Sequence, residues 1–232
     1  MSIISWNYWG LGNLSAVPAL RDLVRTYHHD TVFLCETLVH SSRFVDIKNS
    51  LGFDFCFLVD CVGQGGGLVL LWTKPFDCNL INFSQNFINV SVHEASSPVW
   101  RLTGYYGYLE RQRRRESWNL LRYLVADTSL PWCIFADFND HPTWLLRGFR
   151  ETIINCNLHD LPMEGHQYTW ARRRGKHDFM EDKHVRGLAT MNWIYIFPNF
   201  KLTNGILAKS DHSPILIYLN NALRKKTQKI QI

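Results

Sequence analysis

Short strand-like segments follow one another along the middle of the chain, from Phe53 to Tyr106. Each segment is rich in β-branched and aromatic residues, and Gly, Asn, Pro and Ser separate them at short intervals, as in an antiparallel meander. Five strands are predicted here, at 54–59, 68–72, 78–83, 87–93 and 99–106. A chain with this much contiguous strand has to build its core around β-sheet.

Helical periodicity and fully apolar strands flank this region on both sides. Apolar residues recur at helical spacing in four segments, which predict helices at 17–28 (with Ser15 as N-cap), 41–51, 116–126 and 144–155. Apolar runs at 31–35 and 132–135 are typical of strands covered on both faces, and further strands are predicted at 2–6, 167–171, 201–207 and 214–219. This mixture predicts an α/β fold in which two packed sheets have helices outside.

The composition is that of a globular protein, with 232 residues, of which 46% are hydrophobic and 19% charged. We expect one domain over residues 1–219 and a basic, disordered tail at 220–232. The six Cys occur singly in apolar runs without metal-ligand spacing, which favours buried thiols in a reducing compartment. The chain shows no signal segment and no apolar run of about 18 residues, so we expect an intracellular protein, nuclear or cytoplasmic, without a membrane partner. We also expect a monomer that needs no small organic cofactor.

The net charge of +5 is modest, but the basic residues are concentrated in clusters. Folding could gather these clusters into a phosphate-facing patch, or they could be solvated loops and helix starts. Both interpretations stay open at this point. The candidate nucleic-acid contacts are Arg111, Arg113, Arg114 and Arg115 in one cluster and Arg172, Arg173 and Arg174 in the other.

One glycine-rich segment, Gly63 to Gly67, could be taken for a phosphate-binding loop. It lacks the Lys-Ser/Thr of a P-loop, and it leads into a strand where a phosphate cradle needs the N-terminus of a helix. A hairpin turn or a bulge is therefore the favoured interpretation.

Polar residues stand at the ends of several apolar strands, where a core does not need them. Any one of them alone is a common turn former, but strand ends along one edge of stacked sheets surround a common crevice, so we expect them to converge. These residues are Asn7, Glu36, Asp137, Asn139 and the adjoining pair Asp211 and His212.

The chemistry of this set is that of a metal-assisted phosphodiesterase. Glu36, Asp211 and the amide oxygen of Asn7 are hard oxygen ligands suited to Mg²⁺, with Mn²⁺ as the alternative. Asp137 could orient or deprotonate a water molecule. Asn139 and His212 could donate hydrogen bonds to a phosphate oxygen as charge builds on it.

Seven motifs occur in the order and approximate spacing of the endonuclease/exonuclease/phosphatase superfamily: SIISWNYWGLG, DTVFLCET, GGLVLLW, WRLTGYYG, ESWNLLRYL, PWCIFADFND and SDHSPIL. More closely, residues 1–219 resemble the N-terminal endonuclease domain of plant LINE-type (non-LTR) retrotransposons. The resemblance implies a DNase I-like four-layer α/β sandwich, in which helices flank two mainly antiparallel sheets. It also implies Mg²⁺-dependent nicking of DNA, with a duplex as the expected substrate.

The resemblance assigns a role to each matching position. Asn7 matches the Trp-Asn motif, Glu36 the metal ligand of the Glu-Thr motif, and Tyr106 the tyrosine that contacts the scissile phosphate. Asp137 and Asn139 match the catalytic Asp-Phe-Asn motif, which has Gly where this chain has Ala136. In the Ser-Asp-His motif, Asp211 lies near the metal and His212 contacts the phosphate.

The chain departs from the family pattern at two places. The family has a further Asp, in an Arg-Leu-Asp-Arg motif, that orients the histidine, and alignment of the stretch EDKHVRGLATMNW puts Val185 at that position. In addition, the polar loop after Asp140 is shorter than is usual in the family. Loss of an orienting partner lowers activity by about 10- to 100-fold, or by roughly 10⁴-fold if a Ser-His-Asp triad is the guide. Asp178 or Asp182 could replace the missing carboxylate if either reaches His212.

Three functions remain open from the sequence. The first is a metal-dependent DNA-nicking phosphodiesterase, impaired because Val185 replaces the orienting Asp. The second is a catalytically inactive remnant that binds nucleic acid through its Arg clusters. The third, a phosphatase acting on small phosphoesters or inositol phosphates, is favoured by no feature of the sequence.

Overall fold

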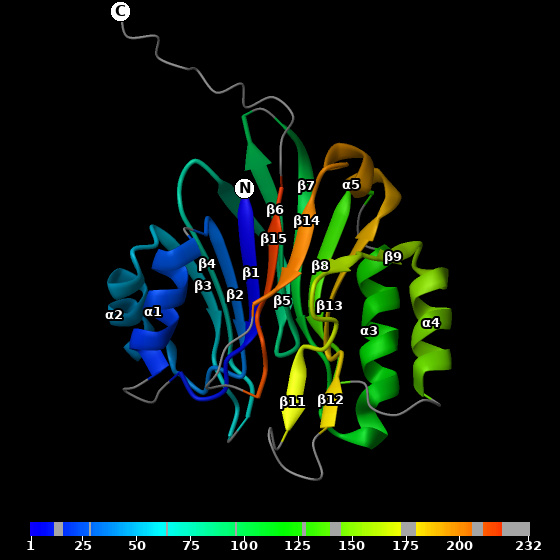
Figure 1. Ribbon diagram of the computed structural model, residues 1–232, viewed down its shortest axis with the longest axis horizontal. Coiled ribbons are helices and arrows are strands. Elements are labelled where there is room, and N and C mark those ends of the chain that lie inside the picture. Colours follow the sequence, from blue (N-terminus) through cyan, green and yellow to red (C-terminus); the bar gives the residue numbers. More distant parts are fainter. Residues whose placement is uncertain are drawn as a thin grey trace, which may run out of the picture.

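The computed structural model describes residues 1–11, 16–27, 29–63, 65–95, 97–126, 129–139, 145–172, 180–205 and 211–219. Its layers run helix, sheet, sheet, helix, with α1 and α2 on one outer side and α3 and α4 on the other (Figure 1). The predicted α/β sandwich of two mainly antiparallel sheets flanked by helices is confirmed.

The elements have the following bounds. The helices are α1 (Ala16–Tyr27), α2 (Ser41–Leu51), α3 (Arg114–Ala126), α4 (Leu145–Asn155) and α5 (Met191–Ile196), and a short 3-10 helix, η1 (Arg111–Arg113), precedes α3. The strands are β1 (Ser2–Asn7), β2 (Thr31–Cys35), β3 (Phe55–Val59), β4 (Leu68–Trp72), β5 (Asp77–Ser84), β6 (Phe87–Glu94), β7 (Ser97–Tyr106), β8 (Trp132–Asp137), β9 (Leu158–Asp160), β10 (Met163–Glu164), β11 (Trp170–Arg172), β12 (Met180–Asp182), β13 (Val185–Thr190), β14 (Lys201–Asn204) and β15 (Ile215–Tyr218).

Each large sheet contains a parallel strand pair near its centre. The seven-stranded sheet has the order β10-β14-β15-β1-β2-β4-β3, and the six-stranded sheet has the order β5-β6-β7-β8-β13-β9. Strand β1 is parallel to β2, with Asn7 opposite Cys35, and β7 is parallel to β8, with Tyr106 opposite Asp137. Within each pair, both carboxyl ends therefore lie at the same edge of the sheet.

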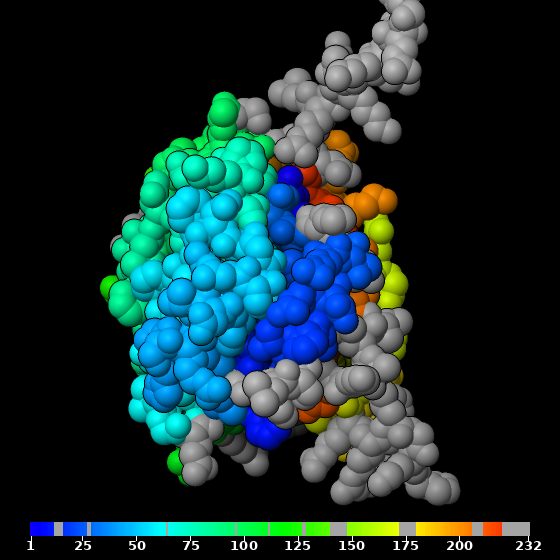
Figure 2. Space-filling view, turned by 90° about the vertical axis from the view of Figure 1, so that its left-hand side faces the viewer, coloured from blue at the N-terminus to red at the C-terminus, as the bar shows by residue number. Residues whose placement is uncertain are grey.

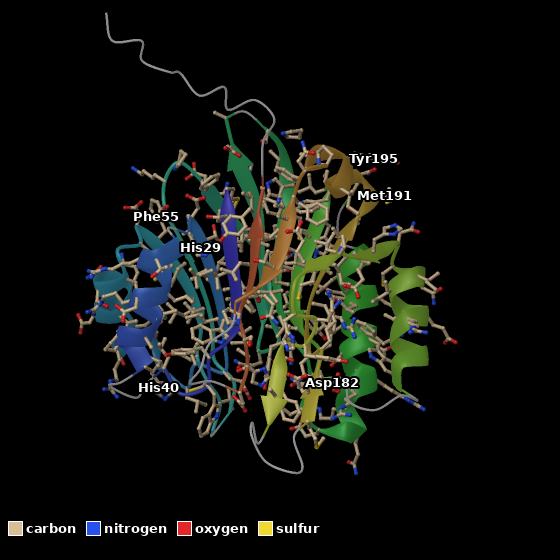
Figure 3. The ribbon with its side chains drawn as sticks, viewed as in Figure 1. His29, His40, Phe55, Asp182, Met191 and Tyr195 are labelled. Carbon is tan, nitrogen blue, oxygen red and sulfur yellow. The ribbon has the colours of Figure 1, made fainter. Side chains whose placement is uncertain are left out.

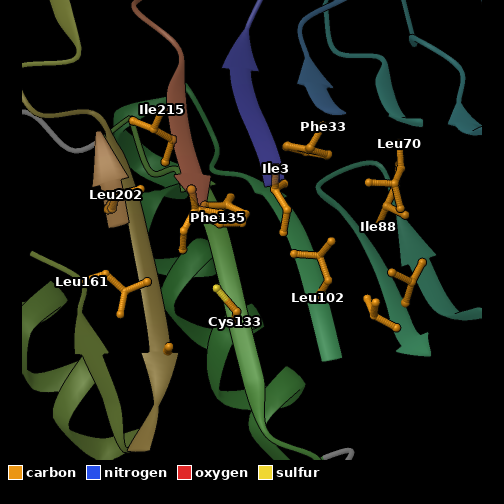
Figure 4. Packing of buried hydrophobic residues seen from close by; sticks show 14 of the residues in the cluster. Ile3, Phe33, Leu70, Ile88, Leu102, Cys133, Phe135, Leu161, Leu202 and Ile215 are labelled. Carbon is orange, nitrogen blue, oxygen red and sulfur yellow. The ribbon is translucent and has the colours of Figure 1, made fainter. Parts of the chain in front are cut away.

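The alternation of side chains along these strands divides the core into three layers. The layer between the sheets contains Ile3, Phe33, Leu102 and Phe135, and Figure 4 shows this packing. The other two layers lie under the outer helices, with Leu23 of α1 in one and Leu121 of α3 in the other. Helices α1 and α2 cover the outer face of the seven-stranded sheet side by side (Figure 2).

One close approach fixes how near the two sheets come. Gly104 of β7 faces Phe33 of β2, and a Cβ on this glycine would lie 2.1 Å from the ring. No real Cβ contact is that short, so only glycine fits here. The two sheets therefore touch where β7 of one parallel pair faces β2 of the other.

Most predicted elements are confirmed within a few residues, but the central strands divide between two sheets. Strands β3 and β4 form a hairpin in the seven-stranded sheet, whereas β5, β6 and β7 form an antiparallel meander in the other. In the Gly63–Gly67 segment, Val62 and Gly65 form an antiparallel bridge, which agrees with the expected turn. The short strands β9, β10 and β12, together with β13 and helix α5, were not predicted. The predicted N-cap Ser15 and the tail 220–232 lie outside the described residues.

All six cysteines are free thiols, as expected. Burial raises the pKa of the Cys35 and Cys133 thiols well above the ordinary value, so both stay neutral and unreactive. Among the helices that the structure describes, none is long and apolar enough to cross a membrane.

Candidate active site

Asn7 and Asp137 meet between the two sheets. Along β1, Asn7 falls on the same face as Ile3, and along β8, Asp137 falls on the same face as Phe135, so alternation directs both side chains into the layer between the sheets. The amide Nδ2 of Asn7 donates a hydrogen bond of 2.8 Å to Oδ2 of Asp137. Both residues are only 2% exposed, so this polar bond replaces apolar packing at the edge of the core.

A second hydrogen bond joins the sheets at the neighbouring strands. Glu36 directly follows β2 and has a positive φ of 57°, a conformation that turns the chain out of the strand. The hydroxyl of Tyr106, at the end of β7, donates to Oε1 of Glu36. Burial of Tyr106, reinforced by the charge of Glu36, raises the pKa of the hydroxyl well above its ordinary value, so the group remains a proton donor at all working pH values.

Asn139 is held close to Asp137 by the turn that ends β8. Its φ of 51° is positive, and its backbone N–H donates a hydrogen bond of 3.1 Å to Oδ1 of Asp137. Its side-chain amide donates a bond of 3.0 Å to the carbonyl of Gly107. Asp137 therefore accepts two hydrogen bonds, one from each sheet, which fix the orientation of its carboxylate.

His212 comes close to Asp137 from the opposite end of the sequence. The indole N–H of Trp6 donates a bond of 3.0 Å to the backbone carbonyl of His212, and the residue forms an isolated antiparallel bridge with Trp170. Nδ1 of His212 lies 3.7 Å from Oδ2 of Asp137. This separation is that of an ion pair and is longer than a hydrogen bond.

Asp211, the neighbour of His212, lies at the surface. Its backbone carbonyl accepts a hydrogen bond of 2.9 Å from Ala171, but its side chain is exposed and makes no hydrogen bond or ion pair within the described part of the chain. The prediction that Asp211, Glu36 and Asn7 are ligands of one metal ion stays a prediction. The Asp and the His of this pair face different surroundings, as adjoining residues at a strand start do.

Val185 occupies the position directly beside Asp137. The two residues are opposite each other in the antiparallel register of β13 and β8, and Val185 is 1% exposed in the layer between the sheets. A carboxylate at this position would lie in the same layer between the sheets as Asp137. Valine supplies only apolar surface there. The carboxylate that lies 3.7 Å from Nδ1 of His212 is that of Asp137.

Two aromatic residues near His212 were not anticipated from the sequence. His184 is buried, its ring stacks on Trp170 with centroids 5.0 Å apart, and it lies 5.9 Å from the His212 ring. Asp182, labelled in Figure 3, lies 3.9 Å from Nε2 of His184, and Asp178 lies outside the described residues. No signal in the sequence marks this stack, because it depends on the short strands β11 and β12, which pair only in the folded chain.

Asn7 and Glu36 fit an oxygen-preferring cation. The Oδ1 atom of Asn7 is buried and has no hydrogen-bond partner among the described residues, although buried oxygens are almost always satisfied. Glu36 is partly exposed beside it, since Asn7 and Cys35 are paired in register. Among the described residues, no three His, Cys, Asp or Glu side chains are grouped to hold a metal. A cation here would thus need water to complete its coordination, as Mg²⁺ commonly does.

One basic cluster lies beside this site. The segment after Tyr106 leads through η1 into α3, and Arg113 places its guanidinium 3.9 Å from the ring centroid of Tyr108 while it forms a salt bridge of 3.0 Å with Glu116. Arg115 is exposed, and Arg114 is partly exposed. The side chains of Arg111 and Arg172, and all of Arg173 and Arg174, lie outside the described part of the chain.

Comparison with known proteins identifies a family for this chain and solved structures with a similar fold. The model of the Endonuclease/Exonuclease/phosphatase family matches residues 4–200. A search of curated proteins found no match. Among solved structures, the chain is similar to the endonuclease domain of TRAS1, a telomere-specific non-LTR retrotransposon, with a TM-score of 0.67 and 14% identity over 95% of this chain and 99% of that one.

Two further structures show the same fold. The 3' phosphatase NExo from Neisseria, bound to a product DNA hairpin, has a TM-score of 0.69 and 16% identity over 95% of this chain and 100% of that one. The mannosyl-6-phosphatase Bt3783 of Bacteroides thetaiotaomicron has a TM-score of 0.68 and 13% identity over 95% and 100% of the two chains. At such identities the likeness concerns the fold, which hosts more than one phosphoester substrate.

Proposed function

The chain belongs to the endonuclease/exonuclease/phosphatase family, and we propose that it is a metal-dependent phosphodiesterase that nicks DNA with reduced activity. The observation that carries this proposal is the pair of hydrogen bonds across the sheets, Asn7 to Asp137 and Tyr106 to Glu36. These bonds bring an acceptor for a proton, a neutral hydroxyl donor and oxygen ligands into one crevice. Such a combination serves the hydrolysis of a phosphoester better than it serves packing.

The contacts of each site residue suggest a different role in the reaction. Asp137, oriented by two hydrogen bonds, would accept the proton of the attacking water. His212 and Asn139 would donate hydrogen bonds to the phosphate oxygens. The Tyr106 hydroxyl keeps its proton and donates a hydrogen bond to Glu36, so it would contact the phosphate only by exchanging that bond for one to a phosphate oxygen. Asn7 and Glu36, with Asp211 as the further predicted ligand, would hold Mg²⁺ or Mn²⁺, which would neutralise charge on the phosphate.

We expect reduced activity because of Val185. In the family pattern an Asp at this position orients the histidine, and valine can neither accept a hydrogen bond nor stabilise a protonated imidazole. Asp137 then has to serve two groups, since it lies 3.7 Å from His212 and is also the candidate base. A residue used in this way cannot be optimally placed for both roles.

DNA is the proposed substrate because of the basic run beside the site. Arg113 and Arg115 belong to the segment that follows Tyr106, so phosphates on either side of the cut would pass close to them. A small phosphoester has no flanking phosphates and gains nothing from such residues. The catalytically inactive binder is the alternative that shares these features, and activity distinguishes the two.

Nicking of supercoiled plasmid in the presence of Mg²⁺ tests the proposal. Asp137→Ala and Glu36→Ala should each abolish the nicking that the parent shows, whereas removal of Mg²⁺ with EDTA should stop all of it. Asp46→Ala is the matched control, because Asp46 is an exposed carboxylate on α2 without a hydrogen bond or ion pair to any described residue. Equal nicking by the parent and both site variants would refute the proposal, and DNA binding without any nicking would favour the inactive binder.

A further inference from the structure

Trp9 is an exposed indole two residues after Asn7, a member of the candidate active site. It is 71% exposed, although tryptophan is among the residues that a fold usually covers. Its backbone is fixed on both sides, because the N–H of Tyr8 donates to the carbonyl of Cys35 and the N–H of Gly10 donates to the carbonyl of Glu36. Trp9 is therefore held against the chain that carries a candidate metal ligand, two residues after Asn7.

The neighbouring aromatic side chains show why Trp9 faces outward. Tyr8 turns toward the helix side of the sheet, where its ring centroid lies 4.0 Å from that of Trp6 and its hydroxyl donates to the carbonyl of Ala16. Trp9 is the next residue, so its side chain is not on the helix side of the sheet, and it is exposed just beyond the end of β1. The backbone position is fixed, while the side chain makes no hydrogen bond or ring contact with the residues that the structure describes; a stacking surface is prepared for a ligand in this way.

A second aromatic surface extends from the other sheet. Tyr108 lies two residues after Tyr106, and Tyr106 donates its hydroxyl to Glu36. The guanidinium of Arg113 covers the Tyr108 ring at 3.9 Å from the ring centroid. Glu36 is therefore bonded to both segments: its carbonyl accepts from Gly10, next to Trp9, and its side chain accepts from Tyr106, two residues before Tyr108. Trp9 follows a strand of one sheet and is apolar, whereas the Arg113-Tyr108 pair follows a strand of the other sheet and is cationic.

We infer that Trp9 stacks on an unpaired DNA base next to the phosphate that is cut, an inference that rests on the function proposed above. Aromatic side chains interleaved with basic groups are typical of single-strand binding sites, because the ring stacks on a base while the cation meets the phosphate. Inside an intact duplex, both faces of each base are already stacked. The substrate class is accordingly DNA with a single-stranded or locally opened segment at the cut.

Binding measured without catalysis tests this inference. Fluorescence anisotropy in EDTA would compare a labelled single-stranded oligonucleotide, the matching duplex and a strand of the same length that carries no bases. Trp9→Ala should weaken binding of the normal single strand by roughly 5- to 150-fold. Trp9→Phe should keep most of the affinity, and neither variant should change binding of the strand without bases.

Tyr195→Ala is the matched control, because Tyr195 is 72% exposed and lies at the opposite end of the molecule from Asp182, as Figure 3 shows. Binding by Trp9→Ala equal to that of the parent, or an equal loss on the strand without bases, would overturn the inference while the nicking activity of the parent still supports the proposed function. A parent that neither binds nor nicks DNA would refute both. Trp9→Ala, at an exposed position, should unfold at the same temperature as the parent.

Discussion

Asn7 and Asp137, which are 130 residues apart in the sequence, share a buried hydrogen bond of 2.8 Å that joins the two sheets. Replacement of Asn7 by Ala removes one of the two donors to a buried carboxylate, so we expect the free energy of unfolding to fall by about 1 to 3 kcal/mol and nicking to be lost. Urea unfolding and the plasmid assay measure both effects. Asn79→Ala, at an exposed asparagine of β5, should change neither; a similar loss in that variant would contradict this explanation.

Asn7→Asp would place two buried carboxyl groups within hydrogen-bond distance, since the parent distance is 2.8 Å. Two like charges this close raise the pKa of one carboxyl group in the folded state. A raised folded pKa means that the stability present at low pH is lost as the pH rises through that pKa. Urea unfolding at pH 5 and pH 8 should therefore show a variant that weakens with rising pH relative to the parent; a pH-independent difference would argue against it.

Tyr106→Phe should alter the alkaline limit of stability. The pKa of Tyr106 is raised in the folded state, so its contribution is complete below the ordinary pKa of about 10 and is lost as the pH rises above that value. The parent should lose up to about 1.4 kcal/mol per pH unit more than Tyr106→Phe above pH 10. Unfolding curves between pH 9 and pH 11.5 measure this slope, and parallel curves for the two proteins would show that the tyrosine is not responsible.

His29 should set an acidic limit that is independent of the active site. Burial lowers the pKa of His29 to about 4, against the weaker opposing effect of Asp30. Because the unfolded chain takes up the proton first, stability is complete above about pH 6.5 and falls by about 1 to 3 kcal/mol as the pH drops toward 4. His29→Gln should flatten this part of the curve, as measured by urea unfolding at pH 4.5 and pH 7.

Val185→Asp tests whether the missing carboxylate limits the activity. We expect nicking to rise by at least about 10-fold, because an oriented histidine commonly contributes that much. Val185→Asn has a similar shape without the charge and should give little gain. Both variants place a polar group at a position that is 1% exposed, so their unfolding free energies have to be compared first. Folded variants with unchanged nicking would show that another feature limits the enzyme.

The salt dependence of DNA binding should separate the roles of two arginines. Arg113 already pairs with Glu116 at 3.0 Å, whereas Arg115 is exposed on the first turn of α3. Loss of one full phosphate contact reduces the slope of log affinity against log salt by about 0.7 to 0.9. Arg115→Ala should approach this value and Arg113→Ala should fall short of it. The opposite order would mean that Glu116 releases Arg113 when DNA binds.

The sequence predicted the convergence of the site better than its connections. Polar residues that end apolar strands identified Asn7, Glu36, Asp137 and Asn139, because strand period and burial are local properties of the chain. Which of them bond to each other depends on the register of the β1–β2 and β7–β8 pairs and on the distance between sheets. Neither quantity can be read from local pattern, so the pairing of Tyr106 with Glu36 became visible only in the fold.

The segment around Val185 shows where the sequence-based prediction was incomplete. Strand β13 was not predicted, because VRGLAT contains a glycine, an alanine and an arginine, residues that do not favour strands when isolated. It forms because β8 and β9 pair with it on both sides. Long-range pairing therefore decided the structure of this segment, and with it the position of Val185 beside Asp137.

The contact of Gly104 with the Phe33 ring has a consequence for how such proteins lose function. A side chain at Gly104 would collide with the Phe33 ring, so we expect it to widen the gap between the sheets and to weaken both hydrogen bonds that cross it, Asn7 to Asp137 and Tyr106 to Glu36. Every recognisable motif would remain in the sequence of such a variant, although the site residues would no longer be held together. A list of motifs alone would consequently overestimate the activity of such a variant, because the spacing of the two sheets does not appear in it.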